Sequence, residues 1–158
     1  MENETVMAKL RYYAHACGVD FIFLDHISMV IAGQDDQNER KSIDKLMTDL
    51  AVFCNETGVG VIAVVHLKRK AGGKDKGFNE GGQVSLTDLR GSGGLEQMSW
   101  NVVALERNQQ DEAEANFSTV RVLKNREWGF TGECERLFYD ANTGRLLPAP
   151  EPETYYEE

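Results

Sequence analysis

The sequence predicts an α/β fold in which a parallel sheet is followed by a β-rich C-terminal part. Two apolar runs, 21–24 and 59–65, are continuous rather than alternating, as is typical of strands buried on both faces of a parallel sheet. A helical pattern lies between them, and a strand, a helix and a strand at this spacing indicate a right-handed βαβ unit. After residue 99 the sequence changes to short β-rich runs joined by polar turns.

Two helices are predicted from apolar residues at helical spacing. The first runs from Val6 to Cys17 and ends at Gly18, since glycine readily adopts the left-handed conformation that terminates helices. The second follows a polar loop, 33–38, and ends at Gly58. Its apolar stripe, which we expect to form the core, consists of Ile43, Leu46, Met47, Leu50, Phe53 and Cys54.

A long glycine- and lysine-rich loop, 72–83, follows the second strand, and loops of this length in compact domains are usually functional or disordered. The residues from Ser85 to Asp88 have the capping-box pattern. They predict a short helix that continues through the glycines to Met98.

The β-rich runs predict an antiparallel or meandering extension of the sheet. They are 100–105, 119–123 and 133–139. From Pro148 onward Pro and Glu dominate, a composition typical of disorder. We therefore predict one domain, 1–147, followed by an acidic, disordered tail, 148–158.

Composition limits where the protein works. With 158 residues the chain has the length of one domain. Its cysteines, Cys17, Cys54 and Cys134, lie far apart, so we expect buried thiols in a reducing compartment rather than a zinc site. No apolar run has the length of a membrane span or a signal sequence, and we expect a soluble cytoplasmic protein with no membrane partner.

The charge is unevenly distributed. A net charge of −9 argues against general nucleic-acid affinity. Basic residues nevertheless concentrate among glycines after His66, at Lys68, Arg69, Lys70, Lys74 and Lys76. A solvated lysine loop is the plainer explanation, whereas glycines that let the backbone approach a polyanion favour phosphate contact. The glycine-rich turn 90–94, at a predicted helix start, is a weaker anion-binding element.

Asp25 ends the first predicted strand, as a Walker B carboxylate does when it holds a nucleotide-bound Mg²⁺. The alternative is an acid that caps the next turn. His66 follows the second strand, and parallel strands place their ligands at one edge, so we expect Asp25 and His66 to lie close together. His66 is then either a structural histidine or a residue that reports hydrolysis to the basic loop.

The sequence contains no G-x-x-x-x-G-K-[ST] loop to cradle the phosphates. Its nearest match, Gly73-Lys74, is followed by Asp75, where the loop requires Ser or Thr.

Arg107 and Arg126 each follow a β-rich run. An arginine in such a place is usually solvated. The alternative for Arg126 is an arginine finger that reaches a neighbouring subunit's nucleotide. Trp128 and Phe130 could anchor such a tip at an interface.

Six stretches together resemble one family of replication enzymes. They are 24–28, 39–41, 65–68, 85–93, 104–110 and 123–126. They are similar to the helicase domain of the bifunctional primase-helicase of T-seven-type podophages, and more distantly to Twinkle and the DnaB-type replicative helicases. The resemblance covers about 6–147. Its most specific motifs are Asp-Leu-Arg-Gly-Ser-Gly and Leu-Glu-Arg-Asn-Gln-Gln.

The resemblance implies an incomplete RecA-like P-loop NTPase core, whose parallel sheet lacks the phosphate-loop strand, in a hexameric ring on single-stranded DNA. It implies that Asp25 binds Mg²⁺ near the γ-phosphate of ATP or dTTP, that His66 is the sensor, and that Arg126 acts in trans. Arg107 and Tyr139 would sandwich the base. Gln97 and Lys124 would also serve the nucleotide. The DNA-binding residues would be Lys68, Lys70, Lys74, Lys76, Arg90 and Gly91.

The family's primase half, phosphate loop and catalytic glutamate would precede Met1. Without the loop amides and lysine the phosphates lose their main donors, so we expect the isolated chain to be inactive without a partner that bears a Walker A loop. The sheet edge where the missing strand belongs should promote association. The acidic tail resembles the family's segment that docks on the replicative polymerase.

The favoured interpretation is a split enzyme, that is, the C-terminal half of a replicative helicase on a separate chain. A function of another class stays open beside it. The chain could be a non-catalytic module that binds single-stranded DNA or polymerase, or a ring subunit that donates Arg126 in trans. A decaying remnant is a third reading. An upstream reading frame that encodes a primase and a phosphate loop would favour the split enzyme.

Overall fold

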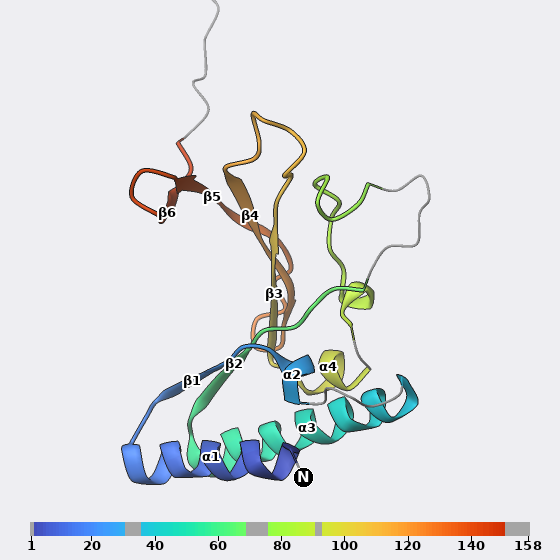
Figure 1. Cartoon of the computed structure of the whole chain (residues 1–158), viewed down its shortest axis with the longest axis vertical. Helices are drawn as coiled ribbons and strands as arrows, with labels where there is room; N and C mark the ends of the chain where they lie inside the picture. The colour runs from blue at the N-terminus through green and yellow to red at the C-terminus, as the bar shows by residue number, and fades with distance from the viewer. Residues whose placement is uncertain (1, 31–35, 69–75, 91–92, 151–158) are drawn as a thin grey trace, which may run out of the picture. The chain divides into compact units, whose positions relative to one another are not determined.

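The computed structural model describes residues 2–30, 36–68, 76–90 and 93–150 (Figure 1). They form two compact units. The first unit consists of Met1–Lys68 and Thr87–Ser99, and the second unit consists of Arg69–Leu86 and Trp100–Glu158. No helix among the described residues is both long enough and apolar enough to cross a bilayer.

The first unit contains the predicted βαβ arrangement. Its elements are α1 (Glu2–Cys17), β1 (Phe21–Leu24), α2 (Ile27–Val30), α3 (Asp36–Thr57), β2 (Gly60–Ala63) and α4 (Gly93–Met98), with the 3₁₀ turn η1 (Leu86–Asp88) at the unit boundary. Strands β1 and β2 pair in parallel, from Phe21 opposite Gly60 to Leu24 opposite Ala63. The strand–helix–strand order and the parallel pairing predicted from the sequence are confirmed.

Glycines end both long helices, as predicted. Gly18 follows α1 with φ of 62°, and Gly58 follows α3 with φ of 73°. The Gly58 amide donates a hydrogen bond to the Cys54 carbonyl at 2.9 Å, which closes the last turn of α3. A side chain at either position would be strained, because residues other than glycine rarely adopt this left-handed conformation.

The predicted apolar stripe of α3 forms the core of the first unit. Ile43, Leu46 and Phe53 are at most 1% exposed. Helix α1 contributes Met7 and Leu10, and the stripe's other members also pack in this cluster. The burial of one helical face over about three turns explains why α3 is stable with a polar outer face.

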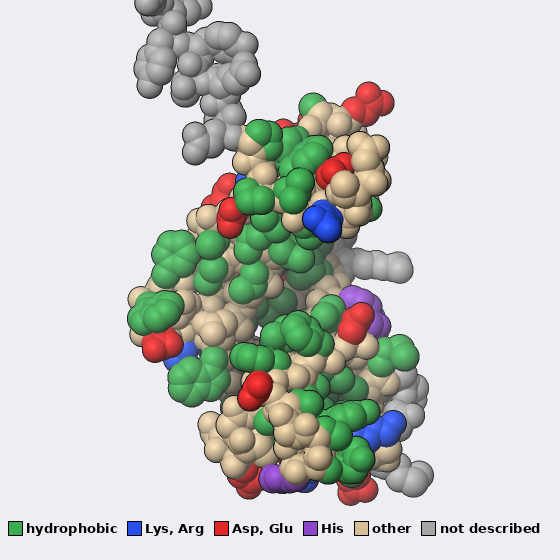
Figure 2. All heavy atoms as spheres, turned by 90° about the vertical axis from the view of Figure 1, so that its left-hand side faces the viewer, with side chains coloured by type: hydrophobic (Ala, Val, Ile, Leu, Met, Phe, Trp, Pro, Cys, Tyr) green, Lys and Arg blue, Asp and Glu red, His purple; other side chains and the backbone are tan. Residues whose placement is uncertain are grey.

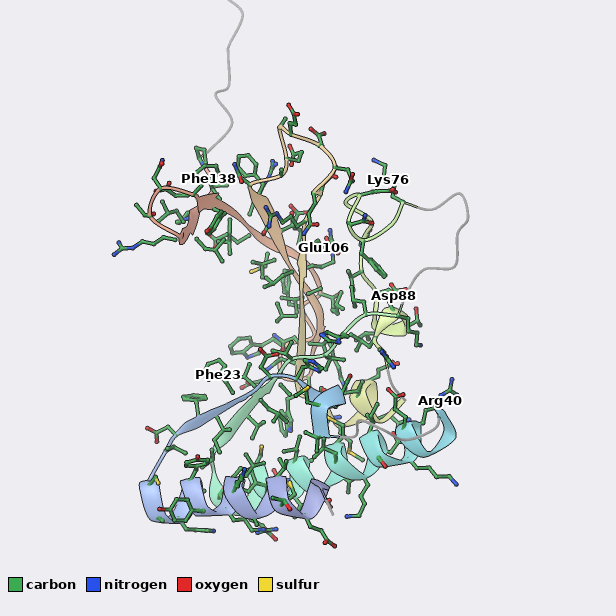
Figure 3. All side chains as sticks on the ribbon, in the orientation of Figure 1. Phe23, Arg40, Lys76, Asp88, Glu106 and Phe138 are labelled. Atoms are coloured by element: carbon green, nitrogen blue, oxygen red, sulfur yellow. The ribbon has the colours of Figure 1, made fainter. Side chains whose placement is uncertain are left out.

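One face of the β1–β2 sheet is uncovered, so the prediction that both faces are buried is wrong for this chain. Ile22 and Leu24 alternate toward the core, whereas Phe21 is 65% exposed and Phe23 is 74% exposed. Ile62 on β2 and Val64, directly after β2, continue this exposed apolar row. Figure 3 shows the Phe23 side chain directed away from the helices. We call Phe21, Phe23, Ile62 and Val64 the uncovered face.

The second unit is a four-stranded antiparallel meander. Its strands are β3 (Asn101–Glu106), β4 (Phe117–Asn125), β5 (Gly132–Asp140) and β6 (Arg145–Pro148), in sheet order β3-β4-β5-β6. The predicted extension of the parallel sheet is wrong in one respect: among the described residues, this sheet shares no strand pairing with β1–β2. Short turns let consecutive strands satisfy one another's backbone groups, so the meander needs no parallel neighbour.

The C-terminal part departs slightly from the prediction. Strand β6 pairs with β5 and includes Pro148, where the predicted tail begins. Residues 151–158, which contain most of the predicted acidic tail, lie outside the described residues. Figure 2 shows hydrophobic side chains on the surface of both units, in addition to the charged ones.

The cysteines do not share the burial that the sequence predicts. Cys17 and Cys134 are exposed, and Cys54 is half-buried on α3. Cys17 is exposed because it is the last residue of α1, beside Gly18. Burial raises the pKa of the Cys54 thiol above its usual value of 9.0, and hydrogen bonds with backbone groups of Val61 and Cys54 partly oppose this.

Alkylation should distinguish these thiols. We expect iodoacetamide at pH 8 to modify Cys54 at least about tenfold more slowly than Cys17 and Cys134, because its thiolate is both scarcer and less accessible. Peptide mass spectrometry over a time course measures the three rates. In urea the rates should converge, and a Cys54 that reacts as fast as Cys17 in the folded chain would contradict the burial.

Candidate nucleotide and DNA site

The ends of β1 and β2 bring the segments of Asp25 and His66 together. The Val64 amide donates to the Leu24 carbonyl at 2.9 Å, and the Ile27 amide donates to the Val64 carbonyl at 3.0 Å. Asp25 lies between these two bonds, and its side chain is exposed. The neighbouring His26 ring is 4.0 Å from the His66 ring, centroid to centroid. The expectation that Asp25 and His66 approach one another at one sheet edge therefore agrees with this geometry.

His26 is a residue of this site that sequence reasoning missed. Its Nδ1 atom is buried and has no hydrogen-bond partner among the residues that the structure describes. Buried polar atoms are nearly always paired, so such an atom marks a place where another group belongs. Its position directly after Asp25 was the signal in the sequence, but only the fold shows that its ring packs against His66.

The residues present fit a magnesium ion that is held mainly by its substrate. Within the described ranges no three His, Cys, Asp or Glu side chains form a cluster able to hold a metal alone. Mg²⁺ in nucleotide sites instead takes one or two carboxylates, water and phosphate oxygens. The exposed carboxylate of Asp25, at the end of a parallel strand, suits that ligand set.

The segment after His66 pairs with residues 88–90. The Lys68 amide donates to the Asp88 carbonyl at 2.7 Å, and the Arg90 amide donates to the His66 carbonyl at 2.8 Å. Leu67 and Leu89 form the antiparallel bridge between them. The predicted helix from Ser85 to Met98 is therefore wrong as one continuous helix: η1 and α4 form its two ends, and these bonds hold Leu89 and Arg90 in an antiparallel pairing between them.

Two predicted DNA-binding residues have protein partners here. Lys68 Nζ donates to the Thr87 carbonyl at 2.9 Å. Arg90 Nε is 3.4 Å from Glu39 Oε1, with the Arg90 side chain 53% exposed. Lys70, Lys74 and Gly91 lie outside the described residues. The structure thus links His66 to Lys68 and Arg90 through the backbone.

Gln97, predicted to serve the nucleotide, lies on α4 beside α3. It lines a small cavity of about 280 Å³ together with Asp44, Thr48, Gly93, Gly94 and Met98. Asp44 Oδ1 accepts a hydrogen bond from the Gly94 amide at 3.1 Å, which fixes the start of α4 on α3. Asp44 and Thr48 are lining residues that the sequence did not single out.

Arg107 and Tyr139 lie at the same end of the second unit's sheet. Arg107 follows β3, and its Nε donates to the Ala115 carbonyl at 2.6 Å. The Tyr139 amide donates to the Asn116 carbonyl at 2.7 Å. Neighbouring residues of one turn thus contact both, and the Tyr139 side chain is 38% exposed. The structure thus places a cation and an aromatic residue, the types that stack on a planar base, beside the same turn.

Lys124 and Arg126 lie at the opposite end of that sheet. Lys124 pairs with Val102 near the start of β3, and the Arg126 amide donates to the Trp100 carbonyl at 3.0 Å. The Arg126 guanidinium is 5.4 Å from the Trp100 ring centroid. The six residues of β3 separate this end from Arg107, a distance of about 20 Å at the usual rise per residue. Arg107 and Arg126 therefore start from opposite ends of the sheet.

The turn after Arg126 presents exposed aromatic side chains. Trp128 is 80% exposed and Phe130 is 51% exposed. Asn125 Oδ1 accepts hydrogen bonds from the Glu127 and Trp128 amides at 3.1 and 3.0 Å, which fixes the turn. Arg126 therefore projects from a defined turn rather than from a loose loop.

Glu106 is a second residue that sequence reasoning missed. Its side chain is 9% exposed, and its two oxygens accept hydrogen bonds from Arg121 Nε at 2.9 and 3.0 Å. The hydrogen bond with Glu106 raises the pKa of Arg121, so the pair stays ionised. The alternation of β3 marked Glu106 as a strand residue but did not reveal its cross-strand partner.

Replacing Arg121 with alanine should destabilise the chain by about 2–4 kcal/mol, because it leaves the Glu106 carboxylate nearly buried without its cation. Urea denaturation followed by circular dichroism measures the change. The matched control is Arg136→Ala, which breaks the exposed ion pair with Glu114 and should cost at most about 1 kcal/mol. Equal costs for the two variants would contradict the role of burial.

Comparisons with known proteins agree with the motifs. The family described as the DnaB-like helicase C terminal domain matches residues 1–145. The "DNA helicase/primase" of Enterobacteria phage T3 is 45% identical over 148 residues, which cover 94% of this chain and 26% of that protein. The "Replicative DNA helicase DnaB" of Leifsonia xyli subsp. xyli (strain CTCB07) is 26% identical over 124 residues, 77% of this chain and 26% of that protein.

The chain thus spans about a quarter of the length of these curated relatives. The resemblance stated from the motifs is confirmed, and so is the α/β class. The family assignment rests on a match over nearly the whole chain rather than on one motif. The chain belongs to the DnaB-like helicase C-terminal domain family.

Proposed function

We propose that the chain is the C-terminal part of an NTP-dependent replicative DNA helicase that moves along single-stranded DNA as a hexameric ring. The family and the phage relative support the helicase class. The observation that carries the proposal is the second unit's sheet, which has Arg107 and Tyr139 at one end and Lys124 and Arg126 at the other. Such a sheet suits a subunit that lies between two nucleotides.

At one end, Arg107 and Tyr139 hold the base of ATP or dTTP by stacking. Asp25 holds the Mg²⁺ that accompanies the nucleotide, and bound Mg²⁺ neutralises charge on the phosphates during hydrolysis. Gln97 completes the contacts of this nucleotide, whereas Lys124 lies at the opposite end of the sheet and serves the nucleotide of the next subunit. At the other end, Arg126 reaches the nucleotide of the next subunit and stabilises the charge that spreads over the transferred phosphoryl group.

DNA phosphates bind two segments: the basic loop after β2, with Lys68, Lys70, Lys74 and Lys76, and the turn that contains Arg90 and Gly91. His66 acts as the sensor between the nucleotide and this segment. The His66 carbonyl accepts a hydrogen bond from the Arg90 amide, and the Lys68 amide donates one to the Asp88 carbonyl. Because these bonds join the two DNA-binding segments, a shift of His66 moves both. The enzyme acts in the host cytoplasm as part of phage replication, where the acidic tail 148–158 contacts the replicative polymerase.

The phosphates are held by a second polypeptide segment, because these residues contain no G-x-x-x-x-G-K-[ST] loop. The two-stranded parallel sheet supports such a partner, since among the described residues β2 pairs with no strand other than β1. We use the term phosphate-loop fragment for a polypeptide that carries this loop and the strand before it.

Mixing the purified chain with a phosphate-loop fragment tests the proposal. The mixture should hydrolyse ATP or dTTP faster when oligo-dT is added, whereas the chain alone should hydrolyse almost none. Light scattering should show that the fragment also reduces self-association through the open edge of the parallel sheet. Brisk hydrolysis by the chain alone would refute the division of the site between two segments.

The absence of the phosphate loop from these residues favours a second candidate function, a non-catalytic module. In that case the chain binds single-stranded DNA or polymerase, or joins a ring and donates Arg126 in trans. Oligo-dT binding by the chain, with no hydrolysis in the mixture, would favour this module over the split enzyme.

A further inference from the structure

A short segment of the second unit, Lys76–Val84, is fixed to the residues around Arg107. The Val84 amide donates to Glu106 Oε1 at 2.7 Å, and the Gln109 amide donates to the Asn79 carbonyl at 2.9 Å. Glu80 and Asn108 form an antiparallel bridge between these two bonds. We call residues 76–84 the arm, because they end the basic loop that begins after His66. Figure 3 shows Lys76 on this arm and Glu106 on β3.

The approach of the two segments is close. Gly81 has φ of 79°, and a Cβ built on it would lie 3.1 Å from the Asn108 Cβ. Gly82 is buried against the carbonyl oxygens of Lys76 and Gly77. The arm therefore has a definite path that only small residues permit, and it cannot move at this point without Asn108.

Glu106 is the strongest of these links. Its carboxylate is held by Arg121 through both oxygens, and Arg121 is also 3.5 Å from Glu133. The short bond from the Val84 amide is therefore made to a fixed, ionised acceptor, which is the stronger kind of hydrogen bond. The Glu106 carboxylate is thus nearly buried and joins two segments, because it accepts hydrogen bonds both from Arg121 and from the Val84 amide.

Arg107 lies between the two residues that hold the arm. Glu106 precedes it and Asn108 follows it, whereas its own side chain turns away to the Ala115 carbonyl. A base that stacks on Arg107 restrains the backbone of 106–108. The same backbone positions the arm, so the restraint reaches Lys76 without passing through His66.

We propose that Glu106 is a positioning residue that couples occupancy of the base site at Arg107 to the order of the arm, and hence to the grip of Lys76 on DNA. This coupling rests on the proposed function, because it requires that a nucleotide base binds at Arg107 and Tyr139. It adds a second connection between nucleotide and DNA to the one through His66.

Hydrogen exchange of the chain in its mixture with the phosphate-loop fragment, with and without saturating Mg·ATP or Mg·dTTP, tests the coupling. Two segments are compared by mass spectrometry: the base-site segment, 107–116, and the arm, 77–84. Nucleotide should slow exchange in both segments by at least about threefold in the wild-type chain. In Glu106→Leu the base-site segment should still be protected, whereas the arm should exchange fast whether nucleotide is present or not.

Two matched variants separate coupling from general damage. Glu106→Gln keeps an oxygen that accepts the Val84 amide, so it should restore most of the nucleotide-dependent protection that Glu106→Leu loses. Glu133→Leu removes the other partner of Arg121 without touching the arm and should behave like the wild-type chain. If Glu106→Leu does not fold, Gly81→Ala supplies the test, because it strains the arm opposite Asn108 and leaves Glu106 intact.

The possible results are distinguishable. Protection of the base-site segment with an unchanged arm would refute the coupling and leave the proposed nucleotide site standing. Arm protection that persists in both Glu106→Leu and Gly81→Ala would refute the role of Glu106. Protection of neither segment would remove the base site from the proposed function, and the coupling with it.

Discussion

Arg126→Ala should lower DNA-stimulated hydrolysis, in the mixture of the chain with the phosphate-loop fragment, by about 10³–10⁵-fold. The reason is geometric as well as electrostatic. Arg126 lies at the end of the sheet opposite Arg107, which suits the proposal that it contributes to a different nucleotide from the one proposed to bind at its own Arg107 and Tyr139. Its guanidinium acts on charge that develops only during phosphoryl transfer, so the loss should appear in kcat rather than in KM.

Steady-state hydrolysis with ATP and with dTTP measures this effect. The matched control is Arg145→Ala, which removes an exposed arginine of β6 and should leave kcat within about twofold of the wild-type value. Nucleotide binding by Arg126→Ala should also stay close to normal. A variant that loses nucleotide affinity but keeps kcat would show that Arg126 binds substrate in the ground state and is no finger.

Asp25→Ala should have the second-largest effect, a loss of about 10²–10⁴-fold in hydrolysis, since one protein ligand of the magnesium disappears. The chain should fold normally, because the Asp25 side chain is exposed and the strand pairing on either side uses backbone groups. Part of the loss should be recovered at high Mg²⁺ concentration. That recovery would separate a weakened metal site from a general defect.

Asp20→Ala is the matched control for Asp25. Asp20 is an exposed carboxylate directly before β1, at the end of the strand away from the site, and only its carbonyl bonds to Gly60. We expect wild-type hydrolysis from this variant, measured at the same Mg²⁺ concentrations. Equal losses in Asp20→Ala and Asp25→Ala would place the effect in net charge rather than in metal binding.

The sequence predicts well those parts of the fold that depend on local patterns. The stripe from Ile43 to Phe53 is buried because a helix can hide only one face, and Gly18 and Gly58 end helices because of their backbone freedom. The approach of Asp25 and His66 follows from parallel pairing, since it is a property of strand direction rather than of side-chain packing.

Contacts between distant segments could not be predicted in this way. The capping-box pattern after Val84 favours a helix, but the two backbone hydrogen bonds that bridge 66–68 and 88–90 outweigh that local preference beyond Asp88. Glu106 looks like an outward strand residue until Arg121 and the Val84 amide are placed beside it. The exposed phenylalanines of β1 are the opposite case. The local sequence pattern predicts burial on both faces of the sheet, but in this chain only one face is covered.

The assignment of Arg126 to a neighbouring subunit is tested most directly by mixing two inactive variants. Arg126→Ala and Asp25→Ala are each combined with the phosphate-loop fragment, then mixed in equal amounts, and DNA-stimulated hydrolysis is measured. If the finger acts in trans, about one interface in four pairs an intact Asp25 with an intact Arg126, and hydrolysis should return to well above that of either variant alone. A mixture that stays as inactive as its components would contradict the assignment, because a finger acting on its own subunit's nucleotide leaves every site with one defect.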